Sequence, residues 1–125
     1  MVKNYASQTE LDLLYKHLID STQYLSLDYD VQCRKSSLPN DLIPDDIAND
    51  WEWIVTISKI LNDNGRLTNE SLTLIEYIDK RFDDVSLGSI AYNEDIWTSN
   101  GLKIHSFWQE QRKLAESLLS QLVPY

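Results

Sequence analysis

Cysteine, glycine and proline are all scarce in this 125-residue chain, which has one cysteine, three glycines and three prolines. Because Cys33 has no second cysteine to pair with, no disulfide can form within the chain, and a free thiol fits a reducing compartment. Three glycines that stand singly cannot build the Gly-rich loop that cradles phosphates. We therefore expect a fold that depends on its apolar core, without disulfides or metal.

Long apolar runs are also absent. No stretch approaches the roughly 20 apolar residues that a membrane-spanning helix needs, and the residues before Ser7 lack the apolar centre of a signal peptide. We expect a cytoplasmic protein that does not enter membranes. The length suits one domain, and the sequence shows no repeat or linker, so we expect residues 1–125 to form a single helical domain.

Basic residues are few. Eleven Lys and Arg stand against twenty Asp and Glu, which gives a net charge of −9, and the whole excess lies between Asp28 and Asp95, where fifteen acids accompany six bases. Such a field repels nucleic acid and anionic membranes and attracts basic partners, although acidity is also common among proteins that need only solubility. The bases do not cluster, so nucleic-acid binding is not expected.

Groups that commonly carry catalysis are sparse. Neither His17 nor His105 has a cysteine or histidine at metal-ligand spacing. Cys33 has no histidine beside it in sequence that could act as its general base, and the Glu-x-x-His pairs of di-metal bundles are missing. We predict a protein that is not an enzyme and needs no cofactor or metal. An enzyme that uses scattered carboxylates in a bundle core is a more distant alternative.

The apolar residues recur mainly at helical spacing. Ser7 and Glu10 form a capping box, and an apolar stripe follows. Residues 25–34 alternate apolar and polar, as a strand would, but they also continue the stripe, and we favour one helix to about Arg34. A second helix should start at Pro44, end at Asn64 before Gly65, and be central because its polar stripe is narrow.

Three further helices complete the prediction. One starts at Thr68 and ends near Asp84, a short one runs from Asn93 through Trp97 until Gly101 stops it, and the last covers about Leu102 to Leu122, with Ile104 in its apolar stripe. The predicted fold is all-α: a compact bundle of four main helices plus one short helix. We expect Trp51, Ile54 and Leu61 to be inaccessible to solvent.

Two segments combine acidic and aromatic residues. Aromatic anchors ringed by charge are typical of tight protein interfaces. We expect Trp53 to be partly exposed and Trp97 to lie at the surface. The sequence leaves open whether one or both segments touch a partner. The candidate partner-binding residues are Asp41, Asp45, Asp46, Asp50 and Trp53 in the first segment, and Asp83, Asp84, Tyr92, Glu94, Asp95 and Trp97 in the second.

The stretch from Leu38-Pro39 to Ile43-Pro44-Asp45-Asp46-Ile47-Ala48-Asn49-Asp50-Trp51-Glu52 resembles small bacterial immunity proteins, the inhibitors of contact-dependent growth inhibition toxins and related polymorphic toxins. The size, helical content and acidity are also similar to those of colicin-nuclease immunity proteins. Their Tyr-Tyr-Pro motif is missing, since the nearest segment, Ala91–Asp95, has one tyrosine and no proline.

This resemblance implies that the chain binds and neutralises a cognate basic toxin domain, such as a nuclease. An acidic helical adaptor or regulatory subunit that binds a cellular protein is the alternative.

Overall fold

The computed structural model describes residues 7–122, and this part of the chain contains helices and turns but no strand. The all-α prediction is confirmed. The expected domain 1–125 includes residues 1–6 and 123–125, which lie outside the described residues. The helices are α1 (Gln8–Ser26), α2 (Tyr29–Lys35), α3 (Ile43–Asp63), α4 (Asn69–Asp84), α5 (Ser99–Ile104) and α6 (Ser106–Gln121), with two 3-10 turns, η1 (Asn40–Leu42) and η2 (Glu94–Trp97).

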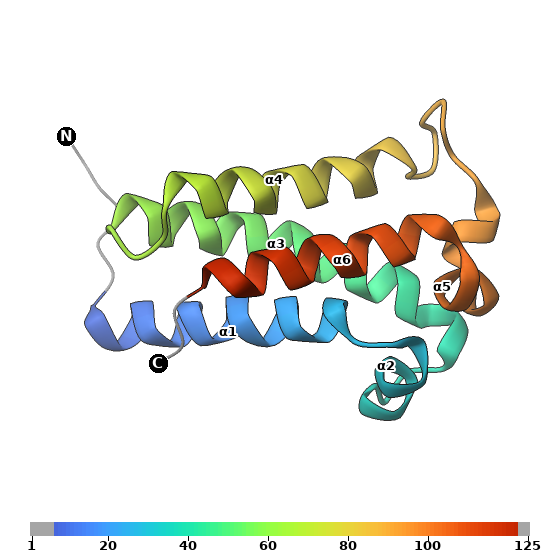
Figure 1. Cartoon of the computed structure of the whole chain (residues 1–125), viewed down its shortest axis with the longest axis horizontal. Helices are drawn as coiled ribbons and strands as arrows, with labels where there is room; N and C mark the ends of the chain where they lie inside the picture. The colour runs from blue at the N-terminus through green and yellow to red at the C-terminus, as the bar shows by residue number, and fades with distance from the viewer. Residues whose placement is uncertain (1–6, 123–125) are drawn as a thin grey trace.

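The four long helices form a ring in which α1 and α4 each pack against both α3 and α6 (Figure 1). The short helices α2 and α5 lie at one end of this ring. We expected the helix now identified as α3 to be central. It packs along α1 and α4 and also contacts η1, η2 and α5, but α6 packs along the same two helices. Helix α3 is therefore one of four helices in the ring, and it is not surrounded by the other three.

The core is apolar and contains two fully buried tryptophans, each with its indole N–H satisfied. Trp51 Nε1 donates to the carbonyl of Ile75 at 3.1 Å, and Trp108 Nε1 donates to that of Ile96 at 2.7 Å. Trp51 is 1% exposed and Ile54 and Leu61 are fully buried, as predicted. Among residues 7–122, no helix combines the length and the apolar character needed to cross a membrane.

The prediction of one N-terminal helix to Arg34 is wrong in its continuity, although residues 29–35 are helical as expected. Helix α1 ends at Ser26, and Leu27 is extended. Distant side chains stabilise this break. Arg112 Nε donates to the carbonyl of Leu27 at 2.9 Å, and Gln32 Nε2 donates to that of Tyr24 at 3.1 Å. The first bond satisfies a carbonyl group just beyond the end of α1, and the second adds a donor to the Tyr24 carbonyl, which also accepts from the backbone N–H of Leu27.

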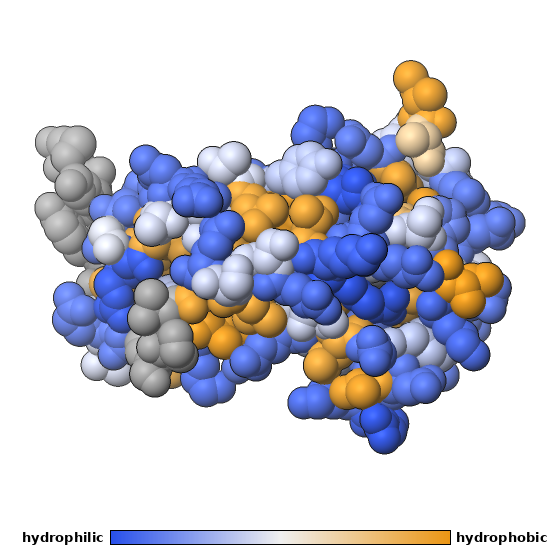
Figure 2. Space-filling model, in the orientation of Figure 1, coloured by the Kyte–Doolittle hydropathy of each residue, from blue (hydrophilic) through white to orange (hydrophobic). Residues whose placement is uncertain are grey.

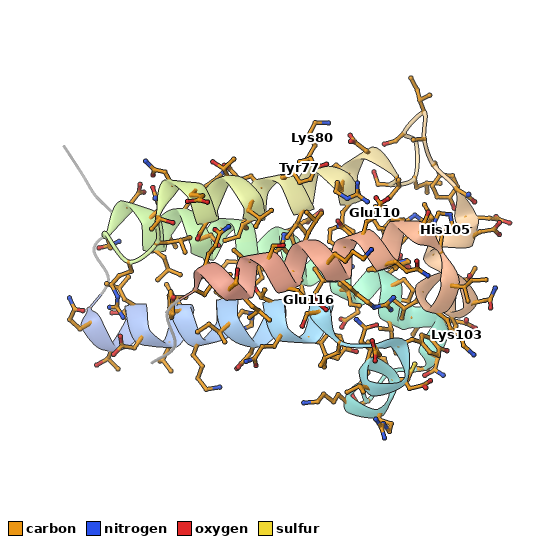
Figure 3. All side chains as sticks on the ribbon, in the orientation of Figure 1. Tyr77, Lys80, Lys103, His105, Glu110 and Glu116 are labelled. Atoms are coloured by element: carbon orange, nitrogen blue, oxygen red, sulfur yellow. The ribbon has the colours of Figure 1, made fainter. Side chains whose placement is uncertain are left out.

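The predicted start of the last helix is also wrong. Gly101 lies inside α5 rather than stopping a helix, and a Cβ there would fall 1.7 Å from the carbonyl oxygen of Asp95. The helix breaks at His105 instead (Figure 3), whose Nδ1 accepts from the backbone N–H of Phe107 at 3.0 Å and so caps α6. Ile104, expected in the apolar stripe, is exposed.

Candidate functional site

A groove between α3, α4 and the segment that follows α4 brings parts of both acidic segments together. Its volume is about 370 Å³. We call it the acidic groove, because four carboxylates line it and no basic side chain does. The lining residues are Asp45, Ala48, Asn49 and Glu52 from α3, Asp79, Phe82 and Asp83 from α4, and Ser86, Leu87, Tyr92 and Trp97 beyond α4.

Helical spacing explains why the two carboxylates of α3 lie on one face of that helix and the two of α4 lie on one face of α4. Asp45 and Glu52 are seven residues apart in α3, which is close to two turns, and Asp79 and Asp83 are four apart in α4. Side chains at these spacings lie on the same face of a helix. The packing of α3 against α4 then turns the two acidic faces toward a common space.

Three aromatic side chains, Phe82, Tyr92 and Trp97, also line the groove. Phe82 is buried, and Tyr92 is 38% exposed. Trp97 is half-buried rather than fully at the surface: its Nε1 donates to the carbonyl of Val85 at 2.9 Å, and its ring meets Trp108 edge to face, with centroids 6.1 Å apart. The groove thus combines fixed aromatic rings with carboxylates.

Asp79 is the least satisfied group in the groove. Its Oδ1 is buried and has no hydrogen-bond partner among the described residues. The pKa of the Asp79 carboxyl is raised to about 6, first by burial and then by the nearby charges of Asp83 and Glu52, while the charge of Lys59 acts in the opposite direction. A buried oxygen without a partner costs free energy, more so when it carries charge. Within residues 7–122, Asp79 Oδ1 therefore lacks a hydrogen-bond donor that would compensate its burial.

This arrangement suits the binding of a cation. Four carboxylates that line one hollow concentrate negative potential there, and aromatic rings in the same lining can attract a positive group. Within residues 7–122, no group of three His, Cys, Asp or Glu side chains is placed to hold a metal ion. The chemistry of the lining favours a polyatomic cation that uses both kinds of wall.

Asp46 and Asp50 lie outside the groove, on the side of α3 toward α1, and Trp53 also lies outside the groove. Asp50 accepts a hydrogen bond from Ser21 Oγ at 2.7 Å and approaches His17 Nε2 at 3.4 Å. Asp46 lines a separate hollow beside Tyr24. Trp53 is 52% exposed, in agreement with the expectation.

The remaining predicted residues have local roles at their own positions. Asp41 Oδ1 accepts from the backbone N–H of Ser99 at 3.3 Å and so helps to fix the start of α5. Asp84 pairs with Lys80 at 3.0 Å, and Lys80 points away from the bundle (Figure 3). Glu94 and Asp95 are exposed in the first turn of η2. The groove therefore holds Asp45, Asp83, Tyr92 and Trp97 of the predicted set.

Glu52, Asp79 and Leu87 line the groove but are not among the binding residues predicted from the sequence. The spacing of Glu52 from Asp45, and of Asp79 from Asp83, was a signal for the two carboxylates. Leu87 belongs to a connector that projects beyond the end of α4 (Figure 1), and Leu87 is 83% exposed while Ile90 is fully exposed. Figure 2 shows an apolar tip on this projection.

Comparison with known proteins found no family model, curated protein or solved structure that matches this chain.

Proposed function

We propose that this chain is an immunity protein that acts in the cytoplasm, where it binds a cognate basic bacterial toxin domain of nuclease type and neutralises it. The convergence of two acidic, aromatic segments on one groove is the observation that carries the proposal. A net charge of −9 supports it, because a basic, phosphate-binding domain is the partner that such a surface attracts.

The mechanism needs only binding. Negative charge steers the basic domain toward the groove and raises the association rate. Tyr92, Trp97 and the exposed Leu87 then supply apolar contact that slows dissociation, as aromatic anchors do in other interfaces. The bound inhibitor covers the toxin's active site or a neighbouring surface.

The test is to express the chain in cells that are exposed to the toxin encoded beside its gene. We expect protection by the wild type and loss of protection with Tyr92→Ala, whose side chain is exposed enough to be removed without unfolding the bundle. Leu13→Ala is the matched control, since Leu13 is also exposed but lies on α1, away from the groove. It should protect like the wild type.

Absence of a neighbouring toxin gene, or failure of the wild type to bind and protect, would overturn the immunity proposal. Co-purification with a housekeeping protein would then favour the acidic adaptor.

A further inference from the structure

We propose that the acidic groove is a socket for one arginine side chain of the partner, held between the carboxylates of α3 and α4 and the aromatic wall, with the connector around Leu87 packed beside it. This inference rests on the proposed function, because it names the group that a basic toxin domain would insert. It also makes a claim about the groove that can be tested without the toxin.

The acidic groove has an excess of negative charge. Asp45 and Glu52 of α3 and Asp79 and Asp83 of α4 face the groove. The bases on these helices balance them only in part: Lys80 is bound to Asp84 and Arg81 to Glu110, while Lys59 is exposed and outside the lining and acts on Asp79 only through its charge. A cation brought by a partner would compensate this charge.

In the part of the chain that the structure describes, the carboxylate of Asp79 is partly buried without a hydrogen-bond donor for one of its oxygens. Its buried Oδ1 lacks a donor among the described residues, and its ionised form is held at a free-energy cost, as the raised pKa indicates. Asp79 therefore already carries the cost of burial before any partner arrives. A cationic donor that enters the groove and reaches the partly exposed Asp79 carboxylate gains a charge-assisted hydrogen bond, which is about twice as strong as a neutral one.

The lining of the groove suits an arginine side chain better than a lysine side chain. A guanidinium is planar, bonds two carboxylate oxygens at once, stacks on aromatic faces and is more weakly hydrated than an ammonium group. The groove offers carboxylates from two helices together with Phe82, Tyr92 and Trp97. Its volume of about 370 Å³ lies within the range of roughly 300–1,000 Å³ typical of ligand sites, so it accommodates a long side chain.

The connector that follows α4 and contains Leu87 lies at the rim of the groove. The hydroxyls of Ser86 and Ser89 both donate to the carbonyl of Asp83, at 2.8 and 2.9 Å, and so tie the connector to the end of α4. Leu87 lines the groove and is largely exposed. A tethered apolar side chain at the rim can cover the aliphatic stem of an inserted arginine, which buries apolar area alongside the charge.

The decisive experiment titrates the full chain with the peptide acetyl-Gly-Arg-Gly-amide and follows the indole N–H signal of Trp97 and the backbone amide of Tyr92 by NMR. We expect saturable shifts confined to groove residues. The same peptide with citrulline, which keeps the shape but lacks the charge, should give no saturable shift. The lysine peptide should bind several-fold more weakly than the arginine peptide.

Two variants locate the charge that matters. Asp79→Asn keeps the shape and should weaken binding of the arginine peptide at least tenfold. Asp63→Asn, on the exposed C-terminal end of α3 and outside the groove, should change it less than twofold. An unchanged indole signal of Trp51 reports that each variant retains its core. Equal binding of citrulline or lysine, or unchanged binding by Asp79→Asn, would overturn the socket.

The toxin, once identified, gives an independent arm. Asp79→Asn should raise the Kd for it by about 30-fold or more, the effect of removing one partner of a buried charge pair. If the wild type protects cells but neither the peptide nor Asp79→Asn behaves as stated, the socket fails and the immunity function stands. If the peptide binds as stated but no toxin is neutralised, the function fails and the socket stands.

Discussion

At the scale of single residues, Asp79 is the group whose environment most opposes its charge. Burial, together with the nearby charges of Asp83 and Glu52, raises the pKa of its carboxyl from the usual 3.8 to about 6. The folded chain therefore binds this proton more tightly than the unfolded chain does. The resulting contribution to stability is fully present below about pH 4 and is lost as the pH rises through about 6. At pH 7 the ionised side chain destabilises the fold.

Asp79→Asn should therefore increase the free energy of unfolding at pH 7, because an amide is easier to bury than a carboxylate. We expect a gain on the order of 1 kcal/mol, since solvent around this partly exposed side chain screens its charge. Most of the gain should disappear at pH 4. Urea unfolding at the two pH values measures it. Asp63→Asn should stay within about 0.5 kcal/mol of the wild type at pH 7, and an equal gain for Asp79→Asn at both pH values would contradict the assignment.

A residue that weakens the isolated fold while lining a groove has the character of a functional position. The sequence alone could not single it out, because Asp79 is one of twenty acidic residues. Its distinction comes from a buried oxygen without a partner, and that depends on how α4 packs against α3.

At the scale of helices, the ends that were predicted well are those fixed by local signals. The capping box of Ser7 and Glu10 and the Thr68 cap are present, and Gly65 follows α3 with a φ of 74°. These signals involve residues within one turn of each other, so a sequence pattern contains them.

The missed break after α1 and the mistaken helix stop at Gly101 both depend on contacts between separate elements, whereas the break at His105 is capped locally by its own Nδ1. Arg112 reaches the carbonyl of Leu27 across 85 positions of the chain, and Gly101 is required by its close approach to Asp95. A pattern along the chain reports neither contact. The same applies to the site: each acidic segment was visible, but the rotation of α3 decides that Asp45 faces the groove while Asp50 faces α1.

Helix α3 offers a matched pair of tryptophans for a prediction about packing. Trp51→Ala should lower the free energy of unfolding by about 3–5 kcal/mol, because it removes a fully buried ring and its hydrogen bond to the carbonyl of Ile75. Trp53→Ala, two residues away on the exposed side, should change it by less than about 1 kcal/mol. Denaturant unfolding of both variants checks this, and similar losses would contradict the orientation of α3.

At the scale of the whole molecule, charge and contact have separable effects on binding. Long-range attraction depends on the net charge of −9 and its position, whereas the groove acts only once the partner has arrived. Charge at a distance changes mainly the association rate, and a desolvated pair changes mainly the dissociation rate. The proposed function thus predicts that acids outside the groove and acids inside it affect different rate constants.

The charge-reversal variant Asp63→Lys with Glu76→Lys tests this separation. Both side chains are exposed and neither lines the groove, and the two reversals change the net charge from −9 to −5. Lysine at position 63 also suits the C-terminal end of α3, where the helix dipole favours positive charge, so we expect the fold to survive. Association with the basic toxin domain should slow several-fold at low salt, with little change in dissociation.

Salt provides the control for this variant, because raising the ionic strength from about 0.01 M to about 1 M shortens the screening length from about 30 Å to about 3 Å. The association rates of wild type and variant should then become equal, since only steering separates them. Asp79→Asn should behave oppositely, with faster dissociation that persists in high salt, because a buried pair is poorly screened. Surface plasmon resonance across this salt series measures both rates. Association of the wild type that ignores salt would refute steering, and Asp79→Asn with unchanged dissociation would refute a desolvated contact in the groove.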